Sequence, residues 1–302
     1  MIRAACLTLS IALGGVMSFV HSAGAQEGGA QEGGAQEVLA APSMGLSLEA
    51  PALFEMLDAM GMYDILAIMG AENIRGAGDM EAQMFPGAGG AAWQAMVTRL
   101  HSSDRMASLF EAAFPRDALT PEQIAEVTTF LHSDAGQRVI SGEVAARFLF
   151  LEEDAVDASN AAFMAAVAAS DPRLDILQRF NEVNGLIERN VSGALNLRFA
   201  FYRGLIDGGA FDADMPESLM LAEVWAQEPE VRQLTVEWLY SYQLTAYSDA
   251  SDGDLEAYVA LSETAAGRAL NAALFAAFDH MLGDLSYDLG AAAAIFIAGE
   301  DA

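Results

Sequence analysis

Two stretches of the sequence decide the fold: residues 120–136, TPEQIAEVTTFLHSDAG, and residues 251–267, SDGDLEAYVALSETAAG. They align at a constant offset of 131 positions. Each begins with a hydroxyl side chain, Thr120 or Ser251, followed three residues later by Gln123 or Asp254, which can accept a hydrogen bond from the amide of the capping residue. This pattern predicts two helices that begin in the same way.

A second hydroxyl, Ser133 or Thr264, follows each of these helices and predicts the start of another helix. The glycine at its third position, Gly136 or Gly267, has no Cβ, so the two helices of the corner can approach closely. A shorter match pairs residues 70–73 with residues 193–196 at an offset of 123. We interpret the pattern as two diverged tandem helical repeats, covering residues 48–170 and 171–302.

The rest of the chain from Leu48 onward also has a helical pattern. It is rich in Ala, Leu, Met, Glu and Gln, and apolar residues recur every three or four positions with little β-type alternation. The sequence therefore predicts an all-α protein with roughly ten helices.

The N-terminal residues are typical of an exported protein. Residues 1–25 resemble a cleavable signal peptide, with Arg3, an apolar segment to about Val20 and the small residues 23–25. Residues 26–47 repeat Gln, Glu, Gly and Ala, which predicts a flexible leader. We expect a periplasmic protein with no transmembrane segment after cleavage and, because Cys6 lies in the signal peptide, no cysteine.

The charge balance restricts the possible partners. The chain has 302 residues and a formal net charge of −29, and all 14 basic residues are arginines. The absence of lysine excludes a Schiff-base or P-loop lysine. A surface this acidic repels phosphate backbones, so we expect no nucleic-acid partner.

Several segments resemble a known family. The run from Ile124 through Ser133-Asp134-Ala135-Gly136-Gln137-Arg138, and the run from Leu255 through Thr264-Ala265-Ala266-Gly267-Arg268, resemble the helix, Ser/Thr, x, x, Gly, basic pattern of the DUF2059 family. Further segments look like exported alphaproteobacterial members of that family: residues 85–87, 91–94, 201–204 and 224–229. The resemblance implies a helical fold and an envelope location. The family has no assigned function, so the resemblance implies no catalytic residue.

Three histidines lie beyond the signal peptide: His101, His132 and His280. None belongs to a His-Glu-x-x-His motif, and the chain has no Gly-x-Ser-x-Gly elbow. The neighbours Asp134 and Asp279 leave a His-Asp pair open, but capping or surface roles fit helix-end residues better. The glycine-rich residues 87–92 follow a helical segment rather than a strand, which favours a loop over a dinucleotide site.

Two kinds of residue cluster suggest metal sites: groups of acidic residues and pairs of methionines. Two groups of acids suggest calcium, although neither has the EF-hand register: Asp249, Asp252, Asp254 and Glu256, and Asp207, Asp212 and Asp214. Methionine pairs four residues apart suggest Cu(I), with core packing or an adaptable apolar groove as the alternatives: Met56 and Met60, and Met80 and Met84. We favour helix capping for the first acidic cluster, a solvated loop for the second, and core packing for the methionines. The sequence thus assigns no catalytic, cofactor-binding or metal-binding residue.

The tryptophans Trp93, Trp225 and Trp238 lie in apolar helical contexts. Such residues commonly anchor a core, and one at a seam between the repeats can face a ligand. We therefore expect a non-catalytic binding or scaffolding protein of the periplasm or cell envelope, whose partner is a protein, a peptide or an apolar ligand. The alternatives are an envelope enzyme using carboxylates or histidines, and a carrier of a hydrophobic ligand or metal that uses the Met-rich first half.

Overall fold

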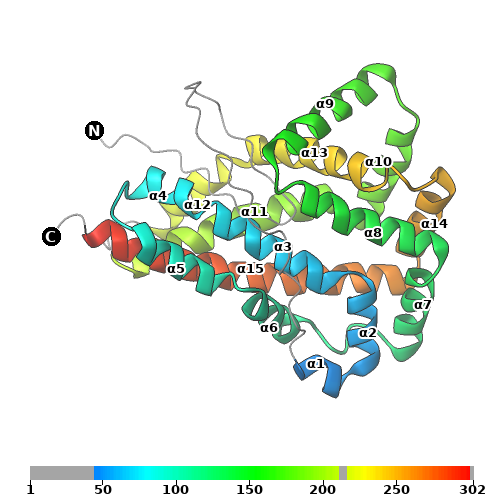
Figure 1. The fold of residues 1–302 in the computed structure, drawn as a ribbon, viewed down its shortest axis with the longest axis horizontal. Helices are drawn as coiled ribbons and strands as arrows, with labels where there is room; N and C mark the ends of the chain where they lie inside the picture. The colour runs from blue at the N-terminus through cyan, green and yellow to red at the C-terminus, as the bar shows by residue number, and fades with distance from the viewer. Residues whose placement is uncertain (1–43, 211–215, 300–302) are drawn as a thin grey trace.

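A computed structural model describes residues 44–210 and 216–299, and within these ranges the chain is helical with no strand, which confirms the all-α prediction (Figure 1). The helices are α1 (Met44–Glu49), α2 (Pro51–Ala59), α3 (Met62–Arg75), α4 (Ala77–Met84), α5 (Gly90–Leu100), α6 (Ser103–Ala113), α7 (Pro121–Leu131), α8 (Asp134–Leu149), α9 (Glu153–Ala169), α10 (Arg173–Asn184), α11 (Leu186–Asp207), α12 (Glu217–Trp225), α13 (Glu228–Ala246), α14 (Asp252–Ser262) and α15 (Ala265–Gly299). The predicted signal peptide and most of the predicted leader lie outside the described residues.

The described residues form more and shorter helices than the roughly ten that the sequence predicts. Single glycines in the left-handed conformation separate helices that sequence periodicity alone would join. Gly61, with φ of 65°, lies between α2 and α3, and Gly185, with φ of 62°, lies between α10 and α11. Only glycine adopts this conformation without a steric cost from Cβ, so each position allows a sharp turn between two helices.

The predicted leader, residues 26–47, extends too far. Helix α1 begins at Met44, and the side chain of Leu46 is completely buried in the core. The backbone amide of Leu46 donates a hydrogen bond to the carboxylate of Glu111, 3.2 Å away. The last residues of the predicted leader, from Met44 onward, therefore belong to the folded protein, and Leu46 anchors them against α6.

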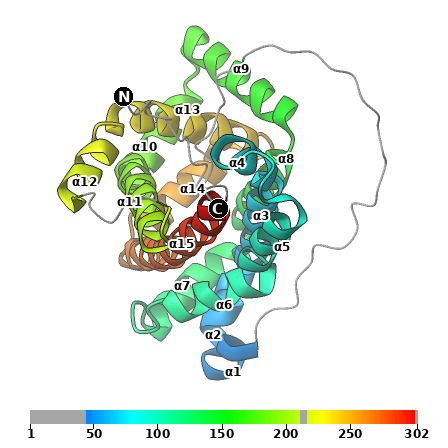
Figure 2. The same cartoon turned by 90° about the vertical axis from the view of Figure 1, so that its left-hand side faces the viewer.

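Helices α11 and α15 form the centre of the molecule and lie side by side in both views (Figures 1 and 2). They run parallel, because Phe201 lies against Gly290 and, further along both helices, Gly208 lies against Ala294. A Cβ on Gly290 would lie 2.2 Å from the carbonyl oxygen of Phe201, and a Cβ on Gly204 would lie 2.1 Å from that of Tyr287. The two backbones therefore touch at a distance that only glycine permits.

Helix α15 is the longest helix of the described residues. It has 35 residues and contains an 18-residue window of mean hydropathy 1.3. By length and composition alone it is the one helix in the described residues that could span a membrane. Half of this window is buried inside the protein, where α15 packs against α5, α6, α7, α11 and α14.

The two helix corners predicted from the quoted stretches are both present. Thr120 and Ser251 each form a capping box with the residue three positions later, and Ser133 and Thr264 accept bonds from the amides of Gly136 and Gly267. A Cβ on either glycine would lie 2.1 Å from a backbone carbonyl oxygen of the preceding helix. The local duplication is therefore observed, while the extension to two complete tandem repeats stays a prediction.

Residues 48–170 and 171–302 interleave instead of packing as separate bodies. Helix α8 of the first range lies against α13 and α14 of the second, and α15 of the second lies against α5, α6 and α7 of the first. The three largest core clusters each include residues from both ranges. The interior is therefore shared between the two ranges.

Candidate functional site: a pocket around Glu143

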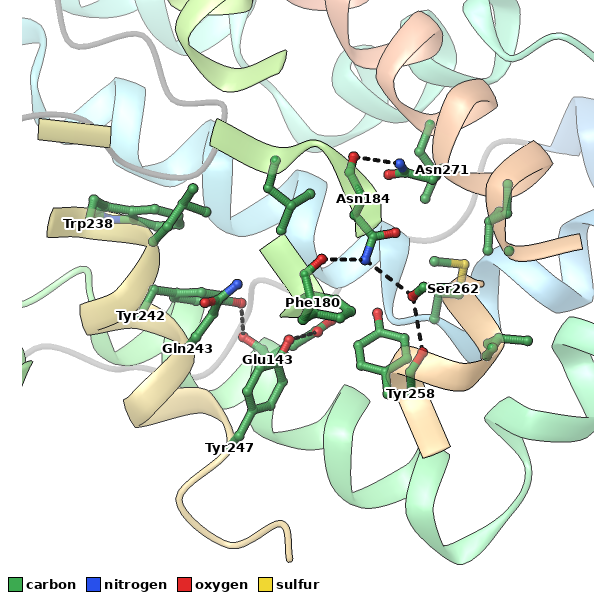
Figure 3. A pocket seen from close by; sticks show the side chains of 17 residues that line it. Glu143, Phe180, Asn184, Trp238, Tyr242, Gln243, Tyr247, Tyr258, Ser262 and Asn271 are labelled. Atoms are coloured by element: carbon green, nitrogen blue, oxygen red, sulfur yellow. Dashed lines mark hydrogen bonds between the residues drawn. The ribbon is translucent and has the colours of Figure 1, made fainter. Parts of the chain in front are cut away.

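A pocket of about 230 Å³ lies where seven helices meet (Figure 3). Its walls come from the end of α2 and from α8, α10, α11, α13, α14 and α15 together with the residues that join them. The lining residues are Met60, Glu143, Phe180, Asn184, Leu186, Trp238, Leu239, Tyr242, Gln243, Tyr247, Tyr258, Leu261, Ser262, Gly267, Leu270, Asn271 and Leu274. The pocket therefore lies between the two predicted repeats and takes residues from both.

Glu143 is the only lining residue of the Asp, Glu, Arg, Lys or His type. It lies near the middle of α8, and its Oε1 accepts a hydrogen bond of 2.6 Å from the hydroxyl of Tyr247. The hydroxyl of Tyr258 also bonds to this carboxyl group, and that of Tyr242 donates to the backbone carbonyl of Glu143 at 2.8 Å. Three tyrosines from two helices thus hold one acid in place.

Burial raises the pKa of Glu143 from 4.5 to about 7, because the charged carboxylate loses its hydration. The hydrogen bonds from Tyr247 and Tyr258 act in the opposite direction, since they stabilise the charged form. Burial also raises the pKa of both tyrosines well above the usual value, and the nearby carboxylate adds to that effect. At neutral pH the phenols are therefore donors, and Glu143 is partly protonated.

Aromatic rings form much of the remaining wall. Trp238 and Tyr242, one turn apart on α13, stack with centroids 4.8 Å apart and an interplanar angle of 10°. Phe180 lies 4.8 Å from Tyr258 and 6.3 Å from Tyr247. Five aromatic rings and one carboxyl group therefore face the same space.

The side of the pocket opposite Glu143 carries amides that are hydrogen-bonded within the protein (Figure 3). The Nδ2 of Asn184 donates to the carbonyl of Phe180 and to the hydroxyl of Ser262, at 3.0 and 3.2 Å. Asn271 donates to the carbonyl of Asn184 at 2.8 Å. These bonds fix the junction between α10 and α11 against α14 and α15, so they give the pocket a rigid wall.

The nearest buried cation is already paired. Arg147, one turn after Glu143 on α8, forms an ion pair with Glu72 of α3, and its guanidinium lies 5.8 Å from the Trp238 ring centroid. Burial raises the pKa of Glu72, and the guanidinium of Arg147 opposes that shift. Within the described residues no arginine forms an ion pair with Glu143. The pocket therefore has an acid without a cationic partner.

The candidate histidines do not meet at a site. His101 is buried beneath Gly70, its Nδ1 lies 3.1 Å from the carbonyl of Val97, and burial lowers its pKa to about 4. His132 and His280 are exposed. None of the three lines the pocket, so the geometry supports the structural interpretation of all three.

In the first candidate calcium cluster, three of the four acids bind arginines. Asp254 accepts two hydrogen bonds from Arg138, at 2.7 and 2.9 Å, and also caps α14. Asp252 pairs with Arg173, and Glu256 pairs with Arg179. In the second cluster Asp207 accepts a bond from Tyr287, while Asp212 and Asp214 lie outside the described residues. Across the described ranges no three His, Cys, Asp or Glu side chains group as a metal site.

The remaining candidates pack in the interior or form a loop. Met56, Met60, Met62, Met69 and Met106 are buried in the largest core cluster, and Met80, Met84 and Met96 pack against the second. Residues 85–89 form a loop. The carboxylate of Glu81 accepts hydrogen bonds from the backbone amides of Gly89 and Gly90 at the start of α5.

The tryptophans separate into three roles. Trp93 is completely buried and donates a hydrogen bond of 2.7 Å to the carbonyl of Ala77, whereas Trp225 is 58% exposed on α12. Trp238 lines the pocket. The expectation that one tryptophan faces a ligand between the repeats therefore applies to Trp238, and neither Trp93 nor Trp225 lies at the pocket.

Comparison with known protein families, with curated proteins and with solved structures finds no match for this chain. Membership of the DUF2059 family therefore stays a prediction. The pocket has to be interpreted from its own geometry.

The raised pKa of Glu143 predicts an unusual pH dependence of stability. The folded protein keeps this proton up to about pH 7, while the unfolded chain releases it near pH 4.5. The folded state binds more protons between these values, so its contribution to stability is lost as pH rises through them. We expect Glu143→Gln to remove this decline and to stabilise the ligand-free protein at pH 8 by about 1 to 3 kcal/mol. Urea denaturation at pH 5 and pH 8 measures the free energy of unfolding at each pH. If this free energy falls equally between pH 5 and pH 8 in both proteins, ionisation of Glu143 does not destabilise the fold.

Proposed function

We propose that the protein is a non-catalytic binding protein of the cell envelope that holds a small organic molecule in the Glu143 pocket. The observation that carries the proposal is the pocket itself: a concave, mostly apolar space with a few fixed polar groups, which is the usual form of a small-molecule site. Its volume exceeds the roughly 150 Å³ of an engineered cavity that accommodates benzene. The export signal in residues 1–25 supports the envelope location.

An enzyme using Glu143 is the second candidate, because a pKa of about 7 suits a general acid or base. General acid-base catalysis on a bound molecule commonly needs a second group, such as a nucleophile or another acid. Among the lining residues Glu143 has no histidine, lysine, arginine or second carboxylate beside it. The pKa values of Tyr247 and Tyr258 are raised well above the usual value, and the hydroxyl of Ser262 is hydrogen-bonded to Asn184 and to the carbonyl of Tyr258, so these groups are poorly suited to proton transfer or nucleophilic attack. The lining therefore favours binding over catalysis.

The proposal is tested with small probes that have a phenyl body and different polar ends: 2-phenylethylammonium, 2-phenylethanol and phenylacetate. We expect at least one to bind with one-to-one stoichiometry in isothermal titration calorimetry. For ligands of this size a dissociation constant of about 0.1 to 1 mM is reasonable.

A pair of variants locates the binding. Leu274→Trp places a large side chain in the pocket and should abolish the heat of binding. Phe275→Trp, at the next position of α15, packs against Arg189 outside the lining and should leave binding unchanged. If no probe binds, or if both variants bind as tightly as the parent protein, the proposed function is wrong.

A further inference from the structure

The chemistry of the lining restricts the ligand further. The pocket presents a carboxyl group, aromatic faces and amide or hydroxyl groups, and it contains no cationic side chain. A carboxylate buried away from water is stable only when a positive group or several donors compensate it. Here two phenols supply part of that compensation, and no arginine in the described residues supplies the rest.

The aromatic rings favour the same class of ligand as the acid. A cation within about 6 Å of a ring centroid is attracted by the negative face of the ring, and quaternary ammonium groups are commonly recognised by several rings at once. The rings of Phe180, Tyr247 and Tyr258 gather around Glu143, while Trp238 and Tyr242 extend the wall (Figure 3). The guanidinium of Arg147 over Trp238 is an example of this interaction within the protein itself.

The electrostatic field of the whole protein also favours a cationic ligand. With a formal net charge of −29, the molecule raises the local concentration of cations and lowers that of anions. An anionic ligand would meet both this field and the unpaired Glu143. A neutral ligand would leave the carboxylate without a positive partner.

We propose that the pocket binds an organic ammonium ion, with its cationic head between Glu143 and the surrounding aromatic rings and its apolar body along Leu270 and Leu274. This inference rests on the proposed function, since it assigns a ligand class to the same pocket. The amide cluster at Asn184, Ser262 and Asn271 then contacts the other end of the ligand.

The test compares the dissociation constants of 2-phenylethylammonium, 2-phenylethanol and phenylacetate for the full chain at pH 7.5 by isothermal titration calorimetry. We expect the ammonium to bind at least 10-fold more tightly than the alcohol, and phenylacetate to bind most weakly. Choline and its neutral carbon analogue 3,3-dimethylbutan-1-ol form a second matched pair, for which the same order is expected. Equal affinities within both pairs, or a preference for phenylacetate, would overturn the ammonium proposal and leave the proposed function intact. Failure of all five probes would contradict the proposed function.

Glu143→Gln keeps the shape of the side chain and removes its charge, so this variant should lose the preference for the ammonium while it still binds the alcohol. Glu111→Gln is the matched control, because Glu111 is a buried acid that likewise accepts a hydrogen bond from a tyrosine, Tyr63, yet lies outside the pocket lining. It should keep the full preference. A Glu143→Gln protein that retains the preference would contradict the role of the carboxylate.

Proton release provides a second measurement, which needs no variant. The groups around Glu143 are Tyr242 and Tyr247 of α13, Tyr258 of α14, and the Arg147–Glu72 pair of α8 and α3. The pKa values of the three phenols are raised, so they keep their protons near neutral pH. Because the pKa of Glu143 is raised above 4.5, its carboxyl group is largely protonated at pH 5, and binding of an ammonium ion there should release the proton. The observed enthalpy should then depend on the ionisation enthalpy of the buffer, and an enthalpy independent of the buffer at both pH 5 and pH 7 would overturn the proposal.

Discussion

A chain cut to residues 44–170 is expected to remain largely unfolded when it is expressed alone. The apolar face of α8 packs on α13 and α14, which this fragment lacks, and the core of its first helices is completed by α15. Leu270 and Met281 of α15 belong to the same buried cluster as Leu57 and Phe110. Without these partners the fragment would expose this apolar surface to water, at a cost of roughly 25 cal/mol for each Å².

The measurement is thermal unfolding followed by far-ultraviolet circular dichroism. Residues 44–302 provide the control and should unfold in one cooperative transition. Co-expression of residues 44–170 with residues 171–302 should restore the transition, because the second fragment supplies the missing helices. A cooperative transition for residues 44–170 alone would mean that the first half folds independently of α13, α14 and α15, and would contradict the prediction.

A large loss of stability is expected when a side chain is added at the close contact between α11 and α15. Gly290→Ala adds a Cβ that would lie 2.2 Å from the carbonyl oxygen of Phe201 and 3.1 Å from the amide of Leu205. Both neighbours are backbone atoms, which cannot rotate away, so the two central helices must separate. We expect a loss of about 3 kcal/mol in the free energy of unfolding, at the upper end for overpacking.

Gly283→Ala is the matched control on the same helix. No atom lies within 4 Å of a Cβ built on Gly283, so alanine should stabilise the protein by about 0.5 to 1 kcal/mol through its higher helix propensity. Urea denaturation of the two variants should therefore give changes of opposite sign. Destabilisation of similar size at both positions would show that the loss at Gly290 does not come from the close contact.

The parts of the fold that local sequence chemistry determines were predictable. The capping boxes at Thr120 and Ser251 are local, since each depends on residues within four positions of one another. The same is true of the turns that follow, where Gly136 and Gly267 lie against the end of the preceding helix. The packing of α15 along α11 was not predictable in this way, because it depends on residues about 90 positions apart in the chain.

The candidate site was not predicted, for the same physical reason. Glu143 is an isolated glutamate in an ordinary helical sequence, Ser-Gly-Glu-Val, and its importance depends on Tyr247 and Tyr258, more than 100 positions later. No spacing rule joins these residues. The seam between the repeats was expected to hold a binding surface, and the residue that fits this expectation is Trp238.

The order of the helices along the chain determines when the pocket can form. Helix α15 follows every other described helix in the chain, yet it lies at the centre of the fold and contributes Leu270, Asn271 and Leu274 to the pocket. Contacts between distant parts of a chain form slowly, because a long loop must close before they stabilise anything. The helices that precede α15 therefore keep apolar faces unpaired until α15 has packed between them. These faces are open to aggregation during that interval, and a chaperone that shields them would increase the yield of the folded protein.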